Sequence, residues 1–226
     1  MIASNHTVDE LLAQGNDLRT VDPDAAIEKY SRAAEISGGS AQALNNLALL
    51  SAEIGRHDDA VAALNRLRTR DAEQFAKTKA FVDEWSLSFL GGAHIQFDMG
   101  ELQEASENYE LYIKYNPDSD EGFTGRGNVL TAQGDLEKAA KAFETALRLN
   151  PESGMAYVGR GQMQIKQQDW DAAIESLTAA IQIFPDHYPA YVIRAEAYDG
   201  KGDSLHAEED RRRANEILAA KSDLTK

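Results

Sequence analysis

The sequence predicts an all-α protein in which antiparallel helix pairs stack on one another, and two observations carry this prediction. One alanine recurs through the chain at steps of 34, 45, 34, 34 and 34 residues: Ala26, Ala60, Ala105, Ala139, Ala173 and Ala207. Prolines and aromatic residues keep the same 34-residue step in the C-terminal half: Pro117, Pro151 and Pro185, with Phe123, Tyr157 and Tyr191. A period of this length indicates a repeat protein whose units bury their apolar faces against each other.

The pattern inside one period predicts two helices, as residues 120–153 illustrate. Apolar and small residues recur at three and four positions up to Leu130, which marks one buried stripe. Gly134 then supplies a left-handed residue that ends the first helix, and Asp135 caps the second. Pro151 stops the second helix because proline disfavours helical backbone in the residue before it.

The motif formed by these positions is an aromatic, a small residue four later, alanine at position 20, an aromatic at 24, alanine at 27 and proline at 32. It resembles the tetratricopeptide repeat, and the resemblance covers nearly the whole chain. It implies a right-handed α-solenoid forming a single domain over 1–226. The six expected repeats are 7–40, 41–74, 86–119, 120–153, 154–187 and 188–221.

The one irregular step holds 11 extra residues and no glycine or proline between Arg56 and Leu90. Eleven residues make about three helical turns, so the apolar stripe keeps its phase across the insertion. We therefore expect one helix from near Asp71 to Met99, with extra turns over 71–85. These turns expose Phe75, Phe81 and Val82 as an oligomer or partner surface, or neighbouring helices cover them. Asp71 and Gln74 resemble a capping box.

Composition excludes several classes of function. The net charge of −15 disfavours nucleic acid and anionic membranes as partners. Cysteine is absent and no apolar run has the length of a membrane span, so we expect a cytoplasmic protein. No metal-ligand spacing joins the five histidines, and no nucleophile or phosphate-loop motif occurs. We expect neither catalysis nor a cofactor nor a metal.

The family resemblance implies that the first helix of each repeat lines a concave groove that binds peptides or partner helices. Carried over position by position, the groove residues are Asn45, Leu49, Leu90, His94, Phe97, Thr124, Asn128, Val158, Gln162, Val192, Glu196 and Asp199. Asn128 can hydrogen-bond a peptide backbone through both donor and acceptor. The groove lacks the paired lysines with which some relatives hold acidic chaperone tails, so a basic or apolar peptide fits better.

An arginine ladder, Arg126, Arg160 and Arg194, keeps the 34-residue step. It could bind anions, but we favour stems packed between helices with heads paired to acids. Taken together, the sequence predicts a scaffold or adaptor that holds a peptide or helix of a partner protein. The alternative is a self-assembling module, a homo-oligomer such as a homodimer formed through the long helix 71–99.

Overall fold

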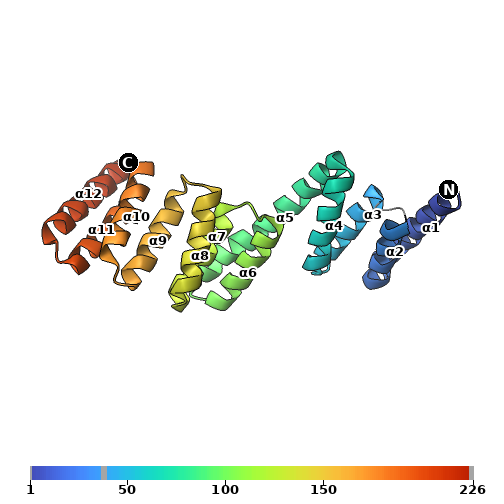
Figure 1. The fold of residues 1–226 in the computed structure, drawn as a ribbon, viewed down its shortest axis with the longest axis horizontal. Coiled ribbons are helices and arrows are strands. Elements are labelled where there is room, and N and C mark those ends of the chain that lie inside the picture. Colours follow the sequence, from blue (N-terminus) through green and yellow to red (C-terminus); the bar gives the residue numbers. More distant parts are fainter. Residues whose placement is uncertain (1, 37–39, 224–226) are drawn as a thin grey trace. The chain divides into compact units, whose positions relative to one another are not determined.

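The structure is a computed structural model that describes residues 2–36 and 40–223, and within them it contains only helices and turns. Twelve helices fall in these ranges, in agreement with the predicted all-α class (Figure 1). Their bounds are α1 Ile2–Leu18, α2 Pro23–Ile36, α3 Ala41–Glu53, α4 His57–Arg70, α5 Ala72–Met99, α6 Leu102–Tyr115, α7 Asp120–Gln133, α8 Leu136–Leu149, α9 Gly154–Lys166, α10 Trp170–Ile183, α11 Tyr188–Lys201 and α12 Ser204–Asp223.

The helices group into two compact units, residues 1–88 and 89–226. The prediction of one domain over 1–226 did not anticipate this division. Helix α5 contributes its first part to one unit and the part from Phe89 onward to the other. In the second unit, α6 to α12 follow one another as stacked antiparallel hairpins (Figure 1). The predicted helix from near Asp71 to Met99 is confirmed by α5.

The recurring alanine is the fourth residue of the second helix in each pair. All six members of the series have no exposed surface. Small residues on the first helices meet the second helices in the same way: a Cβ added at Gly127 would come within 2.7 Å of the Phe143 ring. The helix axes therefore approach closely only because these positions are small.

The turn between the two helices of a repeat uses a left-handed residue. Gly55, Gly100, Gly134 and Gly202 all have positive φ, near 80°. In the fifth repeat the same position holds Gln168, whose φ is 61°. A side chain in this conformation costs about 1–2 kcal/mol, which glycine avoids because it has no Cβ.

We expect Gln168→Gly to stabilise the second unit by up to about 1 kcal/mol, since relief of strain exceeds the added freedom of the unfolded chain. Thermal unfolding followed by circular dichroism measures this as a higher midpoint. The matched control is Gln167→Gly, because Gln167 has ordinary helical backbone with φ −78° and should lose stability. Equal effects of the two changes would contradict the interpretation.

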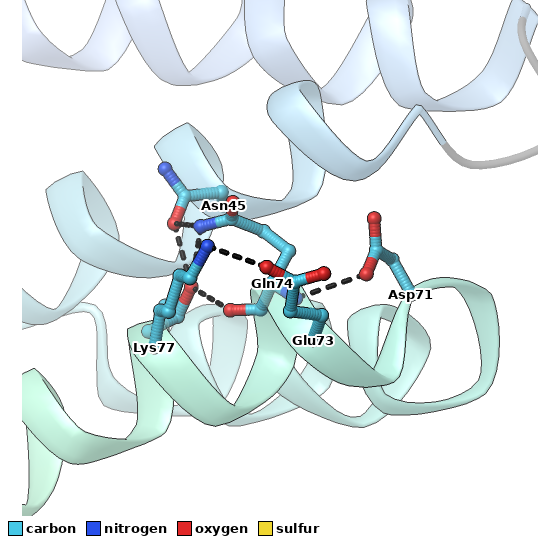
Figure 2. Close-up of polar contacts among 6 residues, drawn as sticks. Asn45, Asp71, Glu73, Gln74 and Lys77 are labelled. Atoms are coloured by element: carbon cyan, nitrogen blue, oxygen red, sulfur yellow. Dashed lines mark hydrogen bonds and ion pairs between the residues drawn. The ribbon is translucent and has the colours of Figure 1, made fainter.

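In the first unit, a polar cluster joins α3 to the beginning of α5 (Figure 2). The Asp71 carboxylate accepts the backbone N–H of Gln74 at 2.9 Å, which is one half of the predicted capping box. The other half does not form, because the Asp71 N–H already donates to the Leu67 carbonyl at 2.8 Å. The Gln74 amide instead donates to Asn45 Oδ1 at 3.1 Å, and Thr78 Oγ1 donates to the same oxygen at 2.6 Å.

Candidate functional site

The second unit carries two adjoining hollows on one face, lined mainly by the first helices of its repeats. The larger, about 560 Å³, lies between the end of α5, the beginning of α7 and the beginning of α9. The smaller, about 330 Å³, continues along α7 and α9 to Glu196 on α11. Phe97 and Asn128 line both hollows, so the two form one depression that we call the α7–α9 groove.

Asn128 lies at the junction of the two hollows. Its side chain is half-buried, and it makes no hydrogen bond to any of the residues described. Its Oδ1 rests against the backbone of Gly159, where an added Cβ would approach to 2.4 Å. The amide thus has a fixed place in the groove while its hydrogen-bonding capacity stays available to a ligand.

The larger hollow is acidic. Its lining includes four carboxylates and, among the described residues, neither lysine nor arginine; the acids are Asp98, Asp120, Glu121 and Glu152. Burial raises the pKa of Tyr109 well above its ordinary value, and the charges of Asp98 and Glu121 raise it further. The phenol therefore stays neutral, and the hollow carries a negative potential that favours cations.

One buried polar atom in this hollow lacks a partner. The Thr124 side chain is 6% exposed, and its Oγ1 has no hydrogen-bond partner. A hydroxyl in such a position normally bonds a neighbouring group, since desolvation without a hydrogen bond costs about 1–3 kcal/mol. Thr124 lines the hollow, so a ligand there could supply the missing bond.

The smaller hollow has mixed charge. Glu196 and Lys166 both line it, beside the apolar side chain of Ile165. The Lys166 ammonium donates to the Thr131 carbonyl in the last turn of α7, at 3.1 Å. This bond satisfies a carbonyl near the negative end of the helix, so Lys166 is partly occupied in structural contacts.

The structure brings six of the predicted groove residues together in the α7–α9 groove, and the other six lie elsewhere. The first set is His94, Phe97, Thr124, Asn128, Gln162 and Glu196. Leu90 and Val158 are buried in the apolar cores between helices, 6% and 7% exposed. Val192 is 48% exposed. Asp199 forms an ion pair with Arg211 of α12.

Asn45 and Leu49 belong to the first unit. The Asn45 side chain is engaged by Gln74 and Thr78, so its expected peptide contact is replaced by a contact between helices (Figure 2). Leu49 lines a separate hollow of about 350 Å³, mostly apolar, with Phe81, Val82 and Trp85. An ion pair between Arg19 and Glu53, 3.1 Å long, also borders it.

The extra turns of α5 are covered in part. Val82 is 1% exposed, so the expectation that it forms an external surface is wrong, because the apolar core of the first unit encloses it. Phe75 is half-buried, and Phe81 is 63% exposed. The homodimer through this segment stays a prediction, and of its three side chains Phe75 and Phe81 keep exposed surface.

All three arginines of the ladder make contacts within the protein, and two of them, Arg126 and Arg194, pair with acids as the favoured interpretation expects. Arg194 donates two hydrogen bonds to the Asp210 carboxylate, at 2.8 and 2.7 Å. Arg160 donates to Ser176 Oγ at 3.0 Å. Arg126 pairs with a carboxylate of α6 at 3.2 Å. These bonds tie first helices to neighbouring second helices, which indicates a structural role for the ladder.

Sequence reasoning missed the part of the groove that comes from second helices and from turns between repeats. Tyr109 lies on α6, and Glu152 and Phe184 lie in or beside such turns. Asp120, the first residue of α7, also lines the hollow and accepts a hydrogen bond from Asn150 at 3.2 Å. Acidic and aromatic residues flank the repeated prolines, and this was the sequence signal that could have indicated this part of the groove.

Two further observations concern all of the residues that the structure describes. No group of three or more His, Asp or Glu side chains in the described part of the chain is arranged to hold a metal ion. None of the helices in the described ranges combines the length and apolar character needed to span a membrane.

The chain belongs to the tetratricopeptide repeat family, whose sequence profile matches residues 12–74, 90–140 and 124–188. A curated relative is the small glutamine-rich tetratricopeptide repeat-containing protein 2 of Mycosarcoma maydis, 32% identical over 113 residues. The match covers 50% of this chain and 29% of that protein, so the chain spans less than a third of its relative's length. Solenoids of this family present extended surfaces for binding other macromolecules.

Solved structures show the same fold. The MamA protein is 21% identical with a TM-score of 0.51, and the match covers 81% of this chain and 94% of that one. A chain of the APC/C hetero-tetramer Cut9–Hcn1 is 17% identical with a TM-score of 0.54, covering 93% of this chain and 43% of that one. At this identity the likeness concerns the arrangement of helix pairs.

Proposed function

We propose that the α7–α9 groove binds an extended segment of a partner protein, and that the chain acts as a scaffold or adaptor. The observation that carries the proposal is the Asn128 amide, which lies where the two hollows meet and makes no hydrogen bond to any described residue. An asparagine amide donates and accepts at once, so it can pair with both polar groups of a peptide unit without reading the side chains.

Charge favours a basic or apolar segment over an acidic one. The chain has a net charge of −15, and four carboxylates line the larger hollow. An acidic segment would meet repulsion at every approach, whereas a basic segment is attracted and oriented before contact. Family membership supports a role in protein interaction in general, and the groove supports the choice of surface.

The test is a selection from a random-peptide library on the purified protein, followed by affinity measurements with a recovered peptide. We expect Asn128→Ala to weaken that peptide about tenfold, since a lost hydrogen bond to a desolvated backbone group costs about 1–1.5 kcal/mol. Asn215→Ala is the matched control because Asn215 is an exposed asparagine of α12. Unchanged affinity in Asn128→Ala would overturn the proposal.

A further inference from the structure

We propose that the larger hollow of the groove is a subsite for one arginine side chain of the bound segment. The inference rests on the proposed function and goes further, because it names the chemical group that the hollow receives. Hereafter we call the larger hollow the acidic hollow. Its guanidinium ligand would lie among Asp98 at the end of α5 and Glu121 and Thr124 near the beginning of α7.

The carboxylates are available for such a ligand. Asp98, one residue from the end of α5, and Glu121, in the first turn of α7, are both exposed, and neither makes an ion pair with any described residue. Both act electrostatically on the buried phenol of Tyr109, which places the two negative charges around one wall of the hollow. A guanidinium can bond carboxylates on both sides because its five donors point outward in one plane.

Thr124 supplies an independent indication of a ligand. Thr124 lines the hollow, and its buried hydroxyl has no hydrogen-bond partner among the residues that the structure describes. The oxygen can accept an N–H from the ligand, which would remove the desolvation cost that the empty hollow carries. Acidic side chains alone would be satisfied by water, whereas a buried hydroxyl without a partner carries a desolvation cost, which a ligand N–H removes once the side chains beside Thr124 move to admit it.

The walls of the hollow favour arginine over lysine. Phe97, Tyr109 and Phe184 line it, and of these Phe97 and Phe184 keep exposed surface on which a ligand can stack. A guanidinium is planar, is less strongly hydrated than an ammonium and stacks on aromatic rings, so it loses less on entering such a site. Lysine would bring one compact charge that keeps its water. The combination of aromatic walls, carboxylates and an unpaired hydroxyl therefore selects the guanidinium group.

The direct probe is N-acetyl-arginine amide, titrated into the full chain and followed by backbone amide resonances in nuclear magnetic resonance. We expect the largest shifts at Glu121, Thr124 and Gly125, which line the hollow on α7. The neutral isostere N-acetyl-citrulline amide should cause no saturable shift, and N-acetyl-lysine amide should bind more weakly. Equal binding of citrulline, or shifts confined to other helices, would overturn the subsite.

Substitutions in the protein provide a second test of the arginine subsite. Asp98→Asn and Glu121→Gln should each weaken the arginine probe about tenfold or more, because hydrogen bonds between charged groups are the strong ones. The matched control is Glu144→Gln, which removes the same charge from an exposed position of α8. If the control weakens binding as much as Glu121→Gln, only net charge matters and the subsite is refuted.

The recovered peptide separates the two proposals. Replacing its arginine by citrulline should weaken it as much as Glu121→Gln weakens the original peptide, and the two changes together should add little. If Asn128→Ala abolishes peptide binding while citrulline has no effect, the groove holds and the arginine subsite falls. If the free arginine probe binds but replacing the peptide's arginine leaves its affinity unchanged, the hollow does not receive an arginine of the bound peptide, and the proposal is overturned.

Discussion

Asp210→Ala is expected to destabilise the second unit by about 3–5 kcal/mol, because it leaves the Arg194 guanidinium buried without its counter-charge. The two side chains are 15% and 6% exposed and are joined by two hydrogen bonds. Burial acts to lower the pKa of Arg194, but hydrogen bonding and the charge of Asp210 raise it overall. Removing the carboxylate therefore removes the group that makes this buried charge tolerable. Urea unfolding followed by circular dichroism measures the loss.

An exposed pair provides the control for this change. Lys201 and Asp171 lie 2.5 Å apart with side chains 48% and 79% exposed, so Asp171→Ala should cost no more than about 1 kcal/mol. Replacing both Arg194 and Asp210 by leucine should recover most of the stability, since neither charge is then left alone. A similar small cost for Asp210→Ala and Asp171→Ala would contradict the account of the buried pair.

Gly125→Ala is expected to destabilise the protein by about 1–3 kcal/mol, although alanine is the better helix former by about 1 kcal/mol. The added Cβ would lie 2.1 Å from Tyr109 Cε1 and 2.3 Å from its Cζ. Tyr109 is 2% exposed, so the ring can move only by displacing its packed neighbours. Because this ring is a wall of the acidic hollow, the same substitution should also weaken the arginine probe.

Gly91→Ala is the matched control, since Gly91 lies inside α5 and a Cβ there would meet nothing within 4 Å. Only the gain in helix propensity remains, and we expect stabilisation by about 0.5–1 kcal/mol. Opposite signs for the two substitutions, measured by urea unfolding, would confirm that close packing sets the choice of glycine at 125. Stabilisation by both would contradict it.

The fold could be predicted from the sequence because its determinants are local and repeated. Gly134 and Asp135 show this: the glycine has a φ of 86°, and the aspartate side chain accepts the N–H of Lys138 at 3.4 Å, as the helix-end pattern predicts. Each such device depends on a few adjacent residues. Because the unit is repeated, the sequence shows the same helix-pair pattern several times, and the family profile confirms this pattern.

The site could be predicted only in part because side chains from different repeats compete for partners. Asn45 and Asn128 belong to the same set of expected groove residues, yet Asn45 is held by Gln74 and Thr78, whereas Asn128 bonds none of the residues in the described ranges. The difference follows from the 11-residue insertion, which places the start of α5 against α3. The burial of Asp210 could not be predicted either, because the charged residues beside it in the sequence give no sign that its side chain is buried.

The most direct test of the central claim is photo-crosslinking of the recovered peptide to a benzophenone amino acid placed at either of two positions. One position is Gln162, exposed on α9 at the edge of the α7–α9 groove, and the other is Glu144, exposed on α8. If the groove holds the partner segment, the peptide crosslinks at 162, the product is lost in Asn128→Ala, and no product forms at 144. Crosslinking at 144 but not at 162 would contradict the claim.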